Sequence, residues 1–295
     1  MLFDERCKGC FKRTYETLLQ KHAANNAQKE ELFTYMEQVI SGDEELSTPE
    51  LQRVLQHKVQ TILAIDDFYQ KEKWQNNEVA LALYPLWKSR VGNAADPFTL
   101  AMRLAIAGNI MDYGANHTFD IEETIHHVID KPLSIDHSSF LKKKIAEAKS
   151  ILYLGDNAGE IVFDRLFLET IEHPNVTFVV RGGATINDAT LEDVQATGMQ
   201  HVANVITNGF DAPSTILERS SEQFRQHFEA ADLIISKGQG NLEGLYALHD
   251  PRIFFMLMAK CDVIAGFIGA EKGNCVVYNE AFHHALKSNS LKDNP

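Results

Sequence analysis

The sequence predicts an α/β protein, a Rossmann-like α/β/α sandwich with a mostly parallel sheet and an N-terminal helical subdomain. Residues 1–149 carry helical patterns without comparable strands. Residues 150–295 alternate short apolar runs with amphipathic segments, and three polar, glycine-containing turns follow predicted strands. A chain of 295 residues is long enough for both parts. We therefore predict two domains, 1–149 and 150–295, of which the second carries the functional site.

Helix-start signals recur in the first part. Thr48-Pro49 provides a cap followed by a proline at the first helical position, and Asp96-Pro97 repeats that signal. An apolar stripe follows the first of them, formed by Leu51, Val54, Leu55, Val59 and Ile62. A third helical stretch, 140–148, is rich in Lys and Ala and closes this part of the chain.

Six apolar or β-branched runs in the second part are typical of buried strands. They are Ile151–Leu154, Val176–Val180, Val202–Ile206, Leu233–Ile235, Ile253–Met256 and Val276–Tyr278. Helical segments lie between several of them, at 161–171, 191–197 and 215–230. This alternation predicts a mostly parallel sheet covered on both faces, whose ligands bind at the carboxyl ends of the strands.

Composition narrows the function. A formal charge of −13 and a pI of about 5.4 argue against nucleic acid or an anionic membrane surface as a partner, because both require clustered positive charge. We expect a small metabolite instead. The sequence starts without a signal-peptide pattern and has no apolar run of ~20 residues, so we expect a cytoplasmic protein with reduced thiols. The sequence does not define an oligomeric state.

The three polar turns are the main functional signal. They are GDNAGE at 155–160, a segment from Arg181-Gly182-Gly183 to Asn187-Asp188, and KGQGN at 237–241. All three would open onto the same edge of the sheet. Oxygens of Asp156, Asn157 and Asp188 could then converge on one cation, and such oxygens suit Mg²⁺ or Mn²⁺. Asp-Asn-x-Gly is also an ordinary helix cap, but three such turns at strand ends favour a site over capping.

Lys237 ends a predicted strand, where its ammonium would act as a phosphate clamp, although a solvated surface lysine is the usual alternative. Backbone amides of Gly182 and Gly183, and those after Gly159, could hold phosphate oxygens. The segment 181–188 lacks the Gly-x-Gly-x-x-Gly pattern, which disfavours a dinucleotide cofactor.

Cys7-x-x-Cys10 has the spacing of a metal or redox pair, but a structural zinc site needs four ligands and the sequence has no second such pair. Cys261 or a histidine could complete a site, and two free thiols on a helix are an equal alternative. The pairs His126-His127 and His283-His284 make poor chelators, because adjacent helical residues point apart.

GDNAGEIVFD (155–164), RGGATINDATLEDV (181–194) and KGQGN (237–241) resemble the signature segments of the damage-control phosphatase family, formerly domain of unknown function 89. The likeness extends through most of the chain: Cys7-x-x-Cys10 resembles the N-terminal pair of the prokaryotic-type branch, and AGNIMDYGA (107–115) is similar to another family segment. Ala184 stands where the family is expected to have proline, and GAEKGN (269–274) departs from the expected turn, which affects the outline of the pocket.

The resemblance implies hydrolysis of small phosphorylated metabolites, including sugar phosphates, with a divalent metal ion (Mn, Mg, Co or Ni). Its metal ligands correspond to Asp156, Asn157 and Asp188, which with Lys237 form the expected catalytic set. The expected substrate-binding residues are Glu160, Arg181, Gly182, Gly183, Asn187, Gln239, Asn241, Asn109 and Asp112.

A phosphate dianion would be repelled by Asp156 and Asp188, so the metal ion must reverse the local charge. The expected nucleophile is a metal-activated water, with Asp156 as a covalent nucleophile the alternative. Two further hypotheses are an adenosylmethionine-dependent carboxyl methyltransferase and a non-catalytic protein that binds a metabolite or metal.

Overall fold

The computed structural model describes residues 3–110 and 121–290 of the chain. Its centre is a seven-stranded sheet with the order β1-β7-β6-β5-β2-β3-β4. The strands are β1 (Ile135–Asp136), β2 (Ile151–Leu154), β3 (Val176–Val180), β4 (Asn204–Thr207), β5 (Leu233–Lys237), β6 (Ile253–Met258) and β7 (Cys275–Tyr278). All neighbouring strands are parallel except β6 and β7, which pair antiparallel. The predicted fold class is confirmed.

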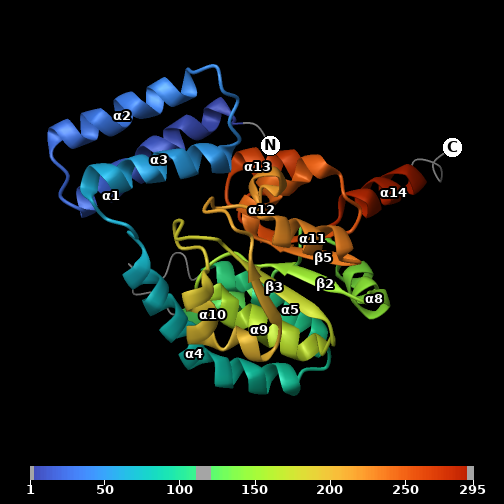
Figure 1. Cartoon of the computed structure of the whole chain (residues 1–295). Coiled ribbons are helices and arrows are strands. Elements are labelled where there is room, and N and C mark those ends of the chain that lie inside the picture. Colours follow the sequence, from blue (N-terminus) through green and yellow to red (C-terminus); the bar gives the residue numbers. More distant parts are fainter. Residues whose placement is uncertain (1–2, 111–120, 291–295) are drawn as a thin grey trace.

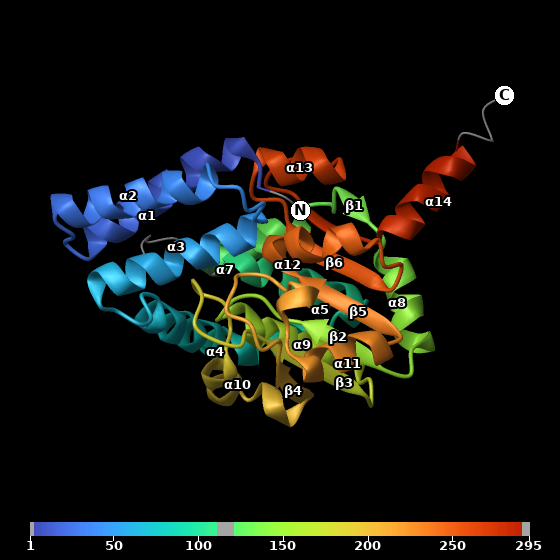
Figure 2. The ribbon, with the colours of Figure 1, turned by 45° about the horizontal axis from the view of Figure 1, so that its top comes forward.

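Helices cover both faces of the sheet (Figures 1 and 2). The described helices are α1 (Lys8–Lys21), α2 (Asn26–Ile40), α3 (Thr48–Leu63), α4 (Gln70–Gly92), α5 (Pro97–Ala107), α7 (Ile121–Asp130), α8 (Ser138–Glu147), α9 (Glu160–Ile171), α10 (Leu191–Thr197), α11 (Glu222–Ala230), α12 (Gly238–Leu245), α13 (Asp262–Ile268) and α14 (Glu280–Ser290).

Alternate residues of each strand contribute to two different hydrophobic cores, as the period of two of a β-strand requires. Tyr153 of β2 and Ile235 of β5 face the core shared with α4, α5, α7, α8 and α9. Leu152 and Ile234, the residues before them, face the core shared with α11, α12 and α13. Both faces are buried, which explains why these strands read as continuous apolar runs in the sequence.

The hydrophobic cores divide the chain differently from the predicted boundary at residues 149 and 150. Helices α1, α2 and α3 enclose a core of their own, in which the buried residues run from Phe11 to Phe68. Helices α4, α5, α7 and α8 instead pack on the sheet and share its core, and β1 joins the sheet edge beside β7. By its packing, the helical subdomain therefore consists of α1–α3, because an amphipathic pattern shows that a helix face is buried but not which partner buries it.

The sequence located most elements within a few residues. The expected strand Val202–Ile206 begins later, at Asn204, and the expected helix 215–230 is replaced by an irregular segment followed by α11. The cap of α3 is Ser47 rather than Thr48, because the Ser47 side chain accepts a hydrogen bond from the backbone N–H of Glu50 and Glu50 completes a capping box. Within 3–110 and 121–290, no helix is both long and apolar enough to cross a membrane.

Candidate functional site

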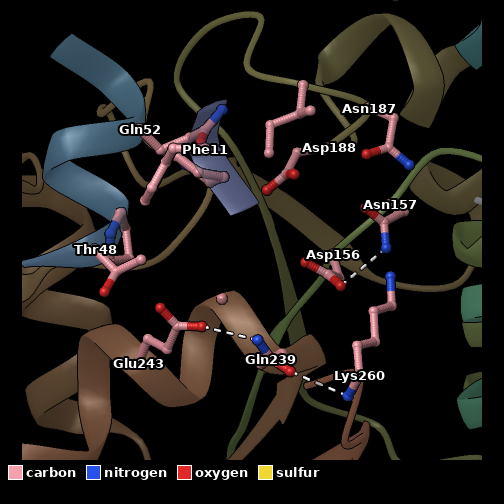
Figure 3. Close-up of a pocket in the computed structure, with 14 residues that line it drawn as sticks. Phe11, Thr48, Gln52, Asp156, Asn157, Asn187, Asp188, Gln239, Glu243 and Lys260 are labelled. Atoms are coloured by element: carbon pink, nitrogen blue, oxygen red, sulfur yellow. Dashed lines mark hydrogen bonds between the residues drawn. The ribbon is translucent and has the colours of Figure 1, made fainter. Parts of the chain in front are cut away.

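A pocket of about 200 Å³ lies where the segments after β2, β3, β5 and β6 meet the helical subdomain (Figure 3). Pockets for drug-sized ligands typically have volumes of about 300–1,000 Å³, so a pocket of this size suits a smaller molecule. One side is formed by the strand-end segments, including Asp156, Asn157, Ile186, Asn187, Asp188, Gln239, Gly240 and Lys260. The other side includes Phe11 of α1 and Thr48, Pro49 and Gln52 of α3.

Backbone pairing between two loops brings the three expected metal ligands together. Asn157 and Asp188 form an isolated antiparallel bridge. On either side of it, the N–H of Ala189 donates to the carbonyl oxygen of Asp156 over 2.8 Å, and the N–H of Ala158 donates to that of Asn187 over 2.9 Å. The side chains of all three expected ligands line the same pocket.

The carboxylate of Asp156 is held by amides and crowded by other negative charges. Its Oδ2 accepts hydrogen bonds from Nδ2 of Asn109 at 3.2 Å and Nδ2 of Asn157 at 2.9 Å. Burial raises the pKa of Asp156 well above its ordinary value, and the charges of Asp188 and Glu160 raise it further. A cation between Asp156 and Asp188 would relieve this repulsion.

Gly238 allows the segment after β5 to approach Asp156 closely. Its φ is +76°, and a Cβ at this position would lie 1.9 Å from Oδ2 of Asp156. No other residue fits, because a side chain would both clash with the carboxylate and occupy a left-handed backbone conformation. Glycine at position 238 therefore lets the turn after β5 come close to the carboxylate of Asp156.

Lys237 lies behind the pocket rather than on its wall. It is 0% exposed, and its ammonium donates to the carbonyl oxygen of Ala105 at 3.0 Å, to Oε1 of Glu160 at 2.7 Å and to the carboxylate of Asp164. Burial alone would lower the pKa of Lys237, but the two carboxylates raise it above its ordinary value. Three protein acceptors use the three donors of the ammonium, so none remains for a phosphate.

Glu160 and Asp164 belong to this buried network. Oε2 of Glu160 accepts from Nδ2 of Asn109 at 3.1 Å and Nδ2 of Asn157 at 3.1 Å. Oδ1 of Asp164 accepts from the hydroxyl of Tyr153 at 2.7 Å, and burial raises the pKa of Asp164 to about 6. Glu160 and Asn109, both expected to bind substrate, therefore contact the expected metal ligands from behind. Asp112 lies outside the described residues.

Arg181 is also buried, with 2% of its surface exposed. Its Nε donates to Oδ2 of Asp188 at 2.5 Å, and its Nη1 donates to Oδ1 of Asn241 at 2.9 Å. Its Nη2 lies 3.6 Å from Oδ1 of Asp156. The arginine thus contacts both acidic side chains of the pocket from inside the protein and does not itself line the pocket.

Carboxylates outnumber the basic groups around the pocket. Among the described residues, Lys237 and Arg181 pair with four carboxylates, and Lys260 adds a further positive charge near Asp156, so a divalent cation would meet more acidic than basic groups. The four carboxylates belong to Asp156, Glu160, Asp164 and Asp188. Among the residues that the structure describes, no three His, Cys, Asp or Glu side chains are grouped as a metal site. The amide oxygen of Asn157 would therefore be the third protein ligand, and two carboxylates with one amide oxygen fit Mg²⁺ or Mn²⁺.

Lys260 lines the pocket and was not identified from the sequence. It follows β6 by two residues, and its backbone N–H donates to Oε1 of Gln239 at 3.1 Å. Its side chain extends along the pocket toward Asp156 and Asn157 (Figure 3). Burial raises the pKa of Asp156, and the positive charges of Arg181 and Lys260 oppose that shift. The signal that could have found Lys260 is the one applied to Lys237, a lysine that follows a buried strand.

The opposite wall of the pocket contains residues that do not follow predicted strands, so the search for polar residues at strand ends could not find them. Thr48 and Gln52 come from α3 of the helical subdomain. Glu243 of α12 lies beside them, and its Oε1 accepts from Nε2 of Gln239 at 3.0 Å. Burial raises the pKa of Glu243 above its ordinary value. These side chains could form hydrogen bonds with the part of a substrate that lies away from the expected metal ligands.

The remaining expected residues divide into two groups. Asn187 and Gln239 line the pocket as expected. The N–H of Gly182 instead donates to the carbonyl oxygen of Phe210 and to Oδ1 of Asn208, each at 3.0 Å, and a Cβ at Gly183 would lie 3.1 Å from Cβ of Asp211. Nδ2 of Asn241, which is 0% exposed, donates to the carbonyl oxygens of Gly155 and Lys237. These three residues shape the loops around the pocket.

The amides after Gly159, predicted to hold phosphate oxygens, include those of Ile161 and Val162, which donate to the carbonyl oxygens of Asn157 and Gly159, each at 3.2 Å. These two amides are therefore satisfied within the protein. Cys7 and Cys10 are free thiols outside the pocket, and burial raises the pKa of Cys7 to about 11.

Comparisons with known proteins agree on one family. The family described as Damage-control phosphatase ARMT1-like domain matches residues 3–276. A damage-control phosphatase of Pyrococcus horikoshii is 36% identical over 224 residues, which cover 75% of this chain and 77% of that protein. A damage-control phosphatase of Archaeoglobus fulgidus is 35% identical over 227 residues, or 75% of this chain and 79% of that protein. The crystal structure of a DUF89 family protein from P. horikoshii superposes with a TM-score of 0.86 at 29% identity, covering 95% of this chain and 99% of that one.

Proposed function

Because the chain belongs to the damage-control phosphatase ARMT1-like domain family, we propose that it is a metal-dependent phosphatase of small phosphate monoesters. The observation that carries this proposal is the convergence of Asp156, Asn157 and Asp188 on one small pocket, where carboxylates outnumber bases. The matching relatives support a phosphatase, and the proposal adds the metal ion, the residues and the class of substrate.

We assign the metal ion to Asp156, Asn157 and Asp188. When bound, the ion supplies positive charge to the phosphoryl oxygens and acidifies a water molecule for attack. Mn²⁺, Mg²⁺, Co²⁺ and Ni²⁺ are all compatible with two carboxylates and an amide oxygen. Arg181 keeps Asp188 in position through its 2.5 Å bond, and Asn109 keeps Asp156 in position through its 3.2 Å bond.

Lys260 takes the role that the sequence suggested for Lys237. Its ammonium lies on the pocket wall, where it would neutralise a phosphoryl oxygen as charge develops in the transition state. Gln239 and Gly240, in the first turn of α12, also line the pocket, and N–H groups at a helix N-terminus favour anions. Lys237 serves instead as an internal counterion for Glu160 and Asp164.

A water molecule is the better candidate than Asp156 for the attacking nucleophile. Oδ2 of Asp156 already accepts two amide hydrogen bonds, and its Oδ1 faces the guanidinium of Arg181. Engagement with those groups and with a metal ion leaves no free lone pair well placed for attack. Acid quenching during turnover separates the two routes, because a phosphoryl group trapped on Asp156 would establish the covalent one.

Hydrolysis of p-nitrophenyl phosphate by chelator-treated protein, with and without each of the four metal ions, tests the proposal. We expect activity only with metal, and we expect Asp188→Asn to reduce kcat/KM by roughly 10²–10³-fold or more, because it weakens binding of the metal ion that would stabilise the negative charge of the transition state. Asp232→Asn is the matched control, since Asp232 is a carboxylate at the opposite end of β5 that caps the N–H groups of Lys149 and Ser150.

Failure to release phosphate with any of these metals would refute the proposal. Methyl transfer from adenosylmethionine that a chelator does not inhibit would support the methyltransferase alternative. Binding of Mn²⁺ without turnover of any phosphate ester would support a binding protein.

A further inference from the structure

Helix α3 presents three polar residues to the sheet domain at intervals of four residues. Thr48, Gln52 and Gln56 therefore share one face of the helix. The first two line the pocket. Gln56 lies one turn further along, where it is 6% exposed and contacts the loop that leads to Asp188. One helix of the separate N-terminal core thus borders both the pocket and the segment that carries an expected metal ligand.

The amide of Gln56 binds that loop at two points. Its Nε2 donates to the carbonyl oxygen of Ala184 at 3.1 Å, and its Oε1 accepts from the backbone N–H of Ile186 at 3.1 Å. The hydroxyl of Thr185 also donates to Oε1, at 3.4 Å. A single side chain from α3 therefore satisfies the backbone of the residues on either side of Thr185, which is itself buried.

The loop needs this support because Ile186 has an unfavourable backbone conformation. Its φ is +41°, in the left-handed region that β-branched residues rarely adopt. Such a conformation persists only where the surroundings determine it. Two hydrogen bonds help to hold this conformation. The N–H of Ile186 donates to Oε1 of Gln56, and the N–H of Asp188 donates to the carbonyl oxygen of Thr185 at 3.0 Å.

The strained residue comes two positions before Asp188. If Ile186 relaxed, the direction of the chain through Asn187 and Asp188 would change, and the pairing of Asn187 with Ala158 would be disturbed. That pairing is what places Asp188 beside Asp156 and Asn157. The position of one metal ligand is thus connected by consecutive bonds to Gln56, which itself does not line the pocket.

We infer that Gln56 is a positioning residue that sets the affinity of the site for its divalent cation by holding Ile186 in its strained conformation. The inference rests on the proposed function, because it assumes that Asp188 binds the metal ion. Residues that orient metal ligands typically change metal affinity by about 10–100-fold when they are removed.

Mn²⁺ binding, measured by the electron paramagnetic resonance signal of free Mn²⁺ during titration, tests the inference without any assay of activity. Gln56→Met keeps the length of the side chain and removes all three of its hydrogen bonds. We expect it to raise the Kd for Mn²⁺ by about 10-fold or more. Asn279→Leu is the matched control. Asn279 is a buried amide that likewise binds backbone groups, those of Pro251, Ile253 and Phe282, but it lies beside the start of β6, whereas Lys260 of the pocket follows the end of that strand. The control variant should lower thermal stability and leave the Kd unchanged.

A double-mutant cycle identifies Ile186 as the link. Glycine adopts a left-handed conformation without strain, so Ile186→Gly should make the site less dependent on Gln56. We expect Gln56→Met to change the Kd by less than about threefold in that background. An equal loss of affinity with and without Ile186→Gly would overturn the proposed link.

An unchanged Kd for Mn²⁺ in folded Gln56→Met, with wild-type protein that binds Mn²⁺ and releases phosphate, would overturn the inference while leaving the proposed function in place. Wild-type protein that neither binds Mn²⁺ nor releases phosphate would refute the proposed function itself. If Gln56→Met does not fold, Gln56→Glu decides the question. It loses only the donor to Ala184, and its added negative charge would by itself strengthen cation binding, so weaker binding supports the inference and unchanged or stronger binding overturns it.

Discussion

Two lysines follow neighbouring strands of the sheet and have different surroundings. Lys237 ends β5, is completely buried and donates to three acceptors of the protein. Lys260 follows β6 and extends along the wall of the pocket. The strands are adjacent and parallel, so both lysines come from the same edge of the sheet. The comparison shows that the position at a strand end brings each lysine to this edge of the sheet. The groups around each ammonium then determine whether it stabilises the fold or can bind a ligand.

The same contrast extends to the carboxylates. Glu160 and Asp164 lie one turn apart in α9, and both bind Lys237. Asp156 and Asp188 share Arg181, but they also face the pocket. One pair is therefore neutralised largely within the protein, whereas the other lies where a ligand can reach it.

The largest expected effect separates the lysines by stability. Lys237→Met leaves Glu160 and Asp164 buried without their counterion, and we expect it to lower the free energy of unfolding by about 3–5 kcal/mol. Lys260→Met, the same substitution at the other lysine, should lower it by less, because Lys260 is only partly buried. Urea denaturation monitored by circular dichroism measures both. Equal stability of the two variants would contradict the distinction.

The next effect separates them by activity. We expect Lys260→Met to reduce kcat/KM for p-nitrophenyl phosphate by roughly 10²–10³-fold, because it removes a positive charge from the position where the transition state develops negative charge. Lys260→Arg should recover part of this loss, since it restores the charge with a different shape. Steady-state kinetics at saturating Mn²⁺ provide the measurement, and wild-type kinetics in Lys260→Met would remove Lys260 from the site.

The smallest expected effect is on the stability that the partly exposed carboxylate of Asp211 contributes. Asp211 binds Arg53 and His57 of α3, and its side chain is 28% exposed. Burial would raise its pKa, but hydrogen bonds from Arg53 and His57 hold the pKa of Asp211 below its ordinary value. Its stabilising contribution is therefore present above the unfolded-state pKa of about 3.9 and is lost as the pH falls through the lower folded-state pKa.

We expect Asp211→Asn to cost about 0.5–1 kcal/mol at pH 7, after allowance for solvent screening, and nothing measurable near pH 3. Thermal unfolding of both proteins across this pH range is the test. If the loss of stability caused by Asp211→Asn instead grows as the pH falls, the pKa of Asp211 is not lowered by folding.

The sequence predicted the fold class and the meeting of Asp156, Asn157 and Asp188, because parallel strands align their carboxyl ends whatever the rest of the chain does. It could not distinguish Lys237 from Lys260, since the local pattern is the same and the deciding partners, Glu160 and Asp164, lie 77 and 73 residues away. Arg181 was predicted to bind substrate, and the sequence could not show that it is buried against Asn241, which lies 60 residues away.

The sequence also could not predict the polar contacts between α3 and the part of the chain that forms the sheet. The apolar stripe of α3 was recognised, but its polar face was not, because a polar face is normally solvated. Here that face supplies Gln52 to the pocket and Gln56 to the loop before Asp188. Only the three-dimensional structure shows that a second part of the chain covers it.

Helices α1–α3 enclose a core of their own and meet the sheet domain through polar contacts such as those of Arg53 and Gln56. Opening of such a unit costs less free energy than unfolding of the whole chain. When it opens, the pocket loses one wall while the sheet and its helices stay intact. Heated or aged protein can therefore keep its circular dichroism spectrum and its solubility after turnover has stopped, so only an assay of phosphate release reports the fraction of competent molecules.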